Sequence, residues 1–172
     1  MRNVGKRAIA FCILLISALL RGSIALPAFF GGRGLLLIPA VVALSLFEET
    51  IPALLYGFAA GVLWDLTAAA PDGLFTLYLG AIALCVSLLA RYAIRRKVSA
   101  ALAASAVFLL LHAAVSAFAG ASGFGDGNVA FFTCGLPAVL AAEVCAVGYY
   151  YIYKAVYADR KRGVVMLPDR SR

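Results

Sequence analysis

The sequence predicts an all-α integral membrane protein of six transmembrane helices, with both termini in the cytoplasm. Hydrophobic residues make up 65% of the 172 residues, and charged residues only 13%. The apolar residues also occur in blocks rather than with the 3.6-residue period of a soluble amphipathic helix. Because so few polar residues cannot cover a water-facing exterior, we expect the lipid bilayer to be the solvent of a single domain, residues 1–172.

Six apolar stretches define the expected spans. They cover approximately residues 8–26, 34–48, 50–66, 73–90, 98–119 and 129–153. Glycine-rich or charged segments such as Gly31–Gly34, Glu48-Glu49 and Arg95–Lys97 separate them. The second and third spans are short, since a hydrocarbon core of ~30 Å is usually crossed by about 20 residues. We therefore expect these two spans to tilt little, to thin the bilayer or to rest against neighbouring helices.

The N-terminal segment has two interpretations. Arg2, Lys6 and Arg7 precede an apolar run at 8–20, which is also typical of a cleaved signal peptide. The segment Ala25-Leu26-Pro27-Ala28 that follows places a proline where cleavage is disfavoured. We therefore expect the segment to be retained as the first span.

Basic residues predict the orientation. With both termini on one side of the membrane, thirteen of the fifteen lysines and arginines lie on that side, and only Arg21 and Arg33 lie on the other. The positive-inside rule then places both termini in the cytoplasm. The same bias accounts for the net charge of +7 without a nucleic-acid partner, because basic residues beside helices attract anionic lipid headgroups. An aromatic belt at this inner face is expected from five tyrosines: Tyr149, Tyr150, Tyr151, Tyr153 and Tyr157.

The third span carries two glycines and an acid at four-residue steps, at Gly57, Gly61 and Asp65. Each step advances about 40° around a helix, so the three residues form one slanting stripe. Glycines allow another helix to approach closely, and an acid within lipid is costly unless it is paired. We therefore expect another part of this chain, or another chain, to cover the stripe.

Two interpretations of Asp65 remain open. Either it ends its helix near water, beside Trp64, and caps the following turn, or it pairs with a group inside the bundle. His112, the only histidine of the chain, is the candidate for that pair. At a rise of ~1.5 Å per residue, Asp65 lies ~22 Å and His112 ~21 Å from the cytoplasmic side. These matching heights allow a hydrogen bond or an ion pair between the two side chains.

Glu143 is the other acid expected within the membrane. It lies ten residues before Tyr153 in the sixth span, near the middle of the bilayer. Three roles are open for it: a hydrogen bond to a neighbouring helix, the lining of a substrate cavity, or contact with a basic residue of a partner. Pro137, in the same span, is expected to kink the helix.

The sequence predicts no catalytic, metal or cofactor site. The segment Gly123-Phe124-Gly125-Asp126 resembles the Gly-x-Gly-Asp motif of intramembrane aspartyl proteases and prepilin peptidases, which need a second aspartate such as Asp65. Asp126 lies in a glycine-rich loop, however, and the charge bias places both acids toward the outside, whereas prepilin peptidases cut at the cytoplasmic face. The four cysteines show no Cys-x-x-Cys or Cys/His ligand spacing, so we expect them to be small buried packing residues.

One stretch of the chain has the order and spacing of a known family. The residues are Tyr56-Gly57-Phe58, Gly61, Asp65-Leu66 and Gly73, which lead into the apolar span 74–90. A weaker match is Leu136–Leu140, which includes Pro137, with its tyrosine-rich continuation. These residues resemble the MreD family of integral membrane proteins, which determine rod shape in bacteria.

The resemblance implies a non-enzymatic, multi-pass scaffold of the bacterial inner (cytoplasmic) membrane. Such a protein belongs to the elongation complex of peptidoglycan synthesis, where it binds MreC and couples MreB filaments to RodA and a class B penicillin-binding protein. The resemblance places partner docking on the stripe of Gly57, Gly61 and Asp65. It implies no cofactor.

The six-span layout with short helices also resembles the substrate-binding subunits of energy-coupling-factor vitamin transporters, to which the MreD fold is similar. Under this alternative, Asp65, His112 and Glu143 line an outward-facing pocket. A neighbouring gene for a coiled-coil, single-span MreC-like protein favours the scaffold, whereas a neighbouring pair of ATPase genes favours transport.

Overall fold

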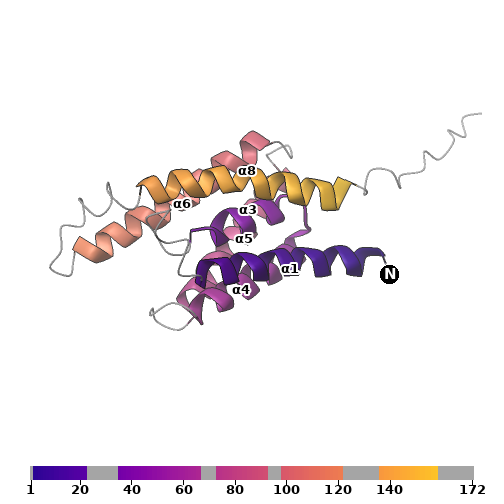
Figure 1. Cartoon of the computed structure of the whole chain (residues 1–172), viewed down its shortest axis with the longest axis horizontal. Coiled ribbons are helices and arrows are strands. Elements are labelled where there is room, and N and C mark those ends of the chain that lie inside the picture. The colour runs from indigo at the N-terminus through magenta and orange to yellow at the C-terminus, as the bar shows by residue number, and fades with distance from the viewer. Residues whose placement is uncertain (1, 23–34, 67–72, 93–97, 122–135, 159–172) are drawn as a thin grey trace, which may run out of the picture.

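The computed structural model describes residues 2–22, 35–66, 73–92, 98–121 and 136–158. Within these residues it contains six helices and no strand. In chain order, and labelled as in Figure 1, the helices are α1 (Arg2–Gly22), α3 (Leu37–Ser45), α4 (Thr50–Asp65), α5 (Leu74–Tyr92), α6 (Val98–Ala121) and α8 (Leu136–Ala158). The expected all-α class is confirmed, and each expected span overlaps one of these helices.

The expected boundaries differ from the observed ones mainly at three helices. α1 begins at Arg2 rather than at residue 8, and α8 continues to Ala158 rather than ending at residue 153. The second expected span, 34–48, contains a helix of only 9 residues, Leu37–Ser45. The first part of the sixth expected span, 129–135, lies outside the described residues.

The short helix α3 lies at the centre of the bundle. All of its residues from Leu37 to Ser45 are buried. It contacts α1, α4, α5, α6 and α8, and Figure 1 shows it between α8 on one side and α1 with α4 on the other. Nine residues extend only ~13 Å along a helix axis, well short of a ~30 Å hydrocarbon core. Of the three ways expected for a short span, α3 therefore rests against its neighbours.

Prolines begin helices in this chain. They occupy the first turn at Pro39 in α3, Pro52 in α4 and Pro137 in α8. The first N–H groups of a helix have no acceptor within it, so a proline there removes no hydrogen bond. In α4 the helical bonding starts directly afterwards, where the N–H of Ala53 donates to the Glu49 carbonyl at 2.9 Å. Pro137 is the second residue of α8 as described, and the residues before it lie outside the described part of the chain, so the kink expected there stays a prediction.

The outer surface of the described helices is apolar. Two segments, Leu74–Tyr92 and Val139–Tyr157, are long and apolar enough to cross a membrane by length and composition, and the other apolar helices are shorter over their described residues. Every described helix except α3 exposes large apolar side chains, among them Ile16 of α1, Ile51 of α4, Leu77 of α5, Val107 of α6 and Val144 of α8. A monomer in water rarely exposes so much apolar surface.

Candidate functional site

The glycines of the third span pack directly against α5. A Cβ atom on Gly57 would lie 2.6 Å from the Ala83 Cβ and 2.7 Å from the Leu79 carbonyl oxygen. A Cβ atom on Gly61 would overlap the backbone of Thr76. Both glycines are buried, and no side chain fits in either place. The expected cover of the stripe is therefore α5 of the same chain.

A third glycine completes this contact from the other side. A Cβ atom on Gly80 of α5 would lie 2.5 Å from the Phe58 ring, so the ring packs over the α5 backbone at that point. We call the contact surface of Gly57 and Gly61 on α4 with Gly80 on α5 the α4–α5 seam. The sequence contained a signal for Gly80, since an isolated glycine inside an apolar helix suggests close packing. Sequence reasoning nevertheless missed its role.

Asp65 caps the first turn of α5. Its Oδ1 atom accepts the backbone N–H of Phe75 at 3.1 Å. Its Oδ2 atom accepts the backbone N–H of Thr76 at 3.0 Å and the Thr76 hydroxyl at 2.6 Å. These N–H groups have no acceptor within the helix, and they form the positive end of its dipole. Of the two interpretations of Asp65, its capping role is confirmed, and the turn that it caps is the first turn of α5.

Gly73 explains why the cap must come from another helix. Its backbone φ is +85°, a left-handed conformation that residues with a Cβ rarely adopt. Its carbonyl accepts the Leu77 N–H at 3.1 Å, so Gly73 is the N-cap residue directly before α5. Glycine has no side chain to accept the orphan N–H groups, and Asp65 supplies the missing carboxylate.

His112 lies in an aromatic cluster beside this cap. Its ring centroid is 5.6 Å from Trp64, 6.1 Å from Phe75 and 5.8 Å from Tyr78. Trp64 and Phe75, which neighbour the Asp65 cap in α4 and α5, also stack with centroids 4.6 Å apart. His112 therefore lies at the height expected from the sequence. Direct pairing of Asp65 with His112 stays a prediction.

Glu143 joins α8 to α6. Its Oε1 atom accepts the hydroxyl of Ser105 at 2.7 Å. Ser105 has no exposed surface and lies inside α6. The first of the three expected roles, a hydrogen bond to a neighbouring helix, is confirmed. Ser105 was missed in the sequence, although a serine inside an apolar helix points to such a bond.

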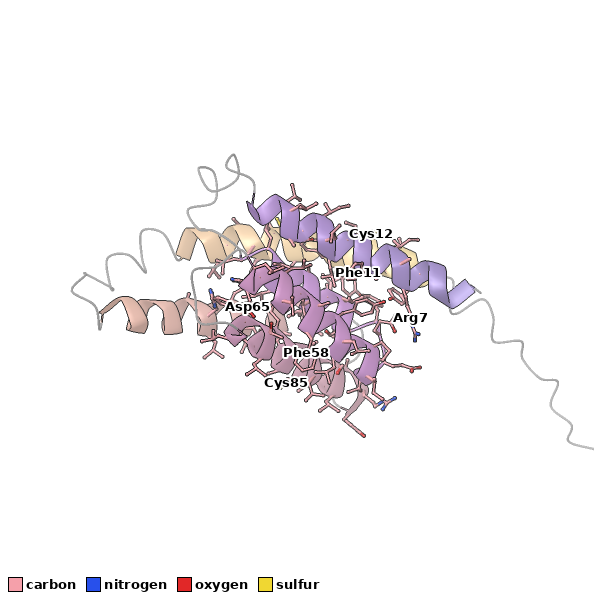
Figure 2. All side chains as sticks on the ribbon, turned by 90° about the horizontal axis from the view of Figure 1, so that it is seen from below. Arg7, Phe11, Cys12, Phe58, Asp65 and Cys85 are labelled. Atoms are coloured by element: carbon pink, nitrogen blue, oxygen red, sulfur yellow. The ribbon has the colours of Figure 1, made fainter. Side chains whose placement is uncertain are left out.

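At the end of the bundle opposite Asp65, tyrosine hydroxyls donate hydrogen bonds to other parts of the chain. Figure 2 shows that Arg7 and Asp65 lie toward opposite ends of the bundle. Near Arg7, the Tyr56 hydroxyl donates to the Arg7 carbonyl at 3.1 Å, and the Tyr157 hydroxyl donates to Glu48 Oε1 at 2.6 Å. Tyr150, Tyr153 and Tyr157 are buried, whereas Tyr151 is 54% exposed. The predicted aromatic belt is therefore wrong for those three tyrosines, which pack in the interior.

The remaining candidate residues are placed as follows. Cys12 and Cys85 are exposed on α1 and α5 (Figure 2), so the expectation that they fill buried gaps is wrong. No group of three or more His, Cys, Asp or Glu in the described part of the chain is placed to hold a metal ion. Asp126 and the rest of the glycine-rich segment 122–128 lie outside the described residues.

The described polar groups thus serve contacts between helices of this chain. Asp65 holds the start of α5, and Glu143 holds α6. Docking of a second chain on the Gly57, Gly61 and Asp65 stripe does not fit this arrangement, because α5 already occupies the stripe. Comparison with protein-family models, curated proteins and solved structures found no match to this chain.

Proposed function

We propose that this protein is an MreD-like scaffold of the bacterial cell-wall elongation complex. It binds MreC and couples MreB filaments to RodA and a class B penicillin-binding protein. The supporting observation is the α4–α5 seam. Gly57, Phe58, Gly61, Asp65 and Gly73, which carry the resemblance, all act at this seam or at the cap beside it. The residues that carry the resemblance thus hold two helices in close, rigid contact, which suits a scaffold.

The proposal includes a six-span membrane topology with cytoplasmic termini. Two described segments are long and apolar enough to span a bilayer, and large apolar side chains are exposed on α1, α4, α5, α6 and α8. The buried helix α3 does not need to meet lipid along its length, because five neighbours surround it. The basic residues orient the bundle with Arg7 and Glu48 at the inner end and Asp65 at the outer end.

The MreC contact is proposed on α8, at Gly148. A Cβ atom there would meet nothing within 4 Å, in contrast to the glycines of the seam. Val144 and Ile152, one turn to each side, are 74% and 47% exposed. In lipid, a small residue between larger ones allows a second helix to approach closely. The single membrane span of MreC is the occupant that the proposed function supplies.

Co-purification from membranes tests this placement. Gly148→Leu fills the notch, and we expect it to reduce MreC capture at least tenfold while the protein stays folded and inserted. Ala103→Leu is the matched control, because Ala103 is an exposed small residue on a different helix, α6. Undiminished capture of MreC by Gly148→Leu contradicts the placement on α8. Failure of the unmodified protein to capture MreC at all contradicts the scaffold itself.

The transport alternative has less support. It requires Asp65, His112 and Glu143 to line one substrate pocket, whereas the described hydrogen bonds commit Asp65 to α5 and Glu143 to α6. Thermal stabilisation of the purified protein by a vitamin would favour transport over the scaffold.

A further inference from the structure

A polar cavity of about 420 Å³ lies at the inner end of the bundle. It is bounded by the turn that joins α3 to α4, the first residue of α4 and the last turns of α5. Its polar lining consists of Glu48, Glu49, Thr50, Ser87 and Arg91. The volume falls within the range of small-ligand sites, about 300–1,000 Å³. No part of the proposed scaffold function uses this cavity.

The cavity contains charges of both signs. Glu48 is held in place because its Oε1 atom accepts the Tyr157 hydroxyl at 2.6 Å. Arg91 lines the same cavity from the last turn of α5. A molecule bound in the cavity would therefore meet a carboxylate and a guanidinium together.

This combination selects among ligand classes. A lysine or arginine from a peptide would be attracted by the glutamates but repelled by Arg91. An anionic headgroup would be attracted by Arg91 but repelled by Glu48 and Glu49. A molecule with one phosphate and one ammonium can pair its phosphate with Arg91 and its ammonium with a glutamate at the same time.

We propose that the cavity binds the phosphoethanolamine headgroup of a zwitterionic phospholipid. The phosphate lies toward Arg91 and the Thr50 hydroxyl, and the ammonium lies toward Glu48. The ammonium has three N–H donors for the carboxylates, whereas the choline group of phosphatidylcholine has none. The inference rests on the proposed membrane orientation, which puts the cavity at the level of the inner headgroups, and it does not depend on MreC.

Lipid retention by the whole purified protein tests the inference. The protein is presented with equal amounts of phosphatidylethanolamine, phosphatidylcholine and phosphatidylglycerol, and bound lipid is counted by native mass spectrometry. We expect phosphatidylethanolamine to be retained about tenfold over each of the others, as for one additional charged hydrogen bond. Equal retention of the three lipids, or a preference for phosphatidylglycerol, overturns the proposal.

Variants locate the preference in the cavity. Arg91→Gln and the double variant Glu48→Gln/Glu49→Gln remove one sign of charge each, and both should abolish the preference. The glutamine at position 48 still offers a carbonyl oxygen to Tyr157. Arg7→Gln is the matched control, since Arg7 is an exposed basic residue at the same end but outside the cavity. A preference that survives Arg91→Gln, or that Arg7→Gln also removes, overturns the proposal.

The same samples separate this inference from the proposed function. Carbonate extraction that releases the protein from membranes contradicts the membrane placement. Failure of the unmodified protein to capture MreC contradicts the scaffold. Absence of a lipid preference in a protein that stays in the membrane and captures MreC contradicts the headgroup site alone.

Discussion

The α4–α5 seam and the outer face of α8 both place glycine inside an apolar helix, with opposite surroundings. In the seam, a Cβ atom on Gly57 would lie 2.6 Å from Ala83, and one on Gly61 would overlap the Thr76 backbone. On α8, a Cβ atom on Gly148 would meet nothing within 4 Å. Glycine inside a helix costs about 1 kcal/mol relative to alanine. Close packing offsets this cost in the seam, whereas nothing in the described part of the chain offsets it at Gly148.

A second difference concerns how the helix pairs are joined. α4 and α5 meet backbone to backbone, and the Asp65 carboxylate binds two N–H groups and one hydroxyl at the start of α5. Between α6 and α8, the Ser105 hydroxyl donates to Glu143 Oε1 at 2.7 Å, a bond between two side chains that leaves the helix backbones apart from it. The comparison indicates that α4 and α5 form the rigid part of the bundle and that α8 has the freer surface. Four substitutions test it, from the largest expected effect to the smallest.

Gly61→Leu should have the largest effect. The new side chain has to displace the α5 backbone at Thr76, so we expect the free energy of unfolding to fall by at least about 3 kcal/mol. Denaturation with SDS, followed by the fluorescence of the single tryptophan, Trp64, measures the loss beside the seam itself. Gly148→Leu is the control, and a similar loss in both variants would remove the distinction between the two glycines.

Asp65→Ala should have the next largest effect. It leaves the N–H groups of Phe75 and Thr76 without their acceptor, and we expect a loss of about 1–2 kcal/mol in the free energy of unfolding. Asp65→Asn keeps one carbonyl oxygen and should lose about half as much. A double-mutant cycle with Thr76→Val should show coupling, because the Thr76 hydroxyl lies 2.6 Å from the carboxylate.

The same cycle with His112→Gln tests the predicted Asp65–His112 pair. Additive losses reject that pair. Additive losses with Thr76→Val as well would contradict the cap described for α5.

Ser105→Ala should have a smaller effect. It removes the hydrogen bond between α6 and α8, and we expect a loss of about 1 kcal/mol in the free energy of unfolding. Glu143→Gln is the matched variant, since its amide carbonyl still accepts the Ser105 hydroxyl, and it should be nearly neutral. An equal loss in the two variants would show that this hydrogen bond is stabilising only with a carboxyl group as its acceptor.

Gly148→Ala should have the smallest effect on stability, and of the opposite sign. The open space around Gly148 accepts a methyl group, and we expect a gain of about 0.4–1 kcal/mol in the free energy of unfolding of the isolated protein. Circular dichroism during SDS denaturation measures this gain. Gly57→Ala provides the contrast, because its Cβ would lie 2.6 Å from that of Ala83, and it should destabilise. Destabilisation by Gly148→Ala would mean that this glycine already packs against something.

Local signals predicted much of the architecture. Changes between apolar blocks and glycine-rich or charged segments located six helices, because each break depends only on neighbouring residues. The stripe of Gly57, Gly61 and Asp65 was correctly expected to be covered, since a helix places residues four apart on one side. The open alternatives were those that depend on distant parts of the chain, such as the identity of the covering helix.

The wrong predictions have a common physical origin. The buried tyrosines and the exposed cysteines each required knowledge of which way a helix faces in space. In a water-soluble protein, the alternation of polar and apolar residues gives that direction. Here the expected solvent is itself apolar, so a leucine that faces lipid and a leucine that faces a neighbour look alike in the sequence.

By itself, the sequence determined an all-helical chain with six apolar segments, a strong charge asymmetry and an acid that requires a partner, because composition and local order suffice for these properties. Only the tertiary structure decided that α3 is enclosed, that Asp65 binds the start of α5, and that Gly61 is covered whereas Gly148 is open. These features depend on which surfaces meet across long separations in the chain. In an apolar surrounding, shape and hydrogen bonding choose those surfaces, and hydropathy does not.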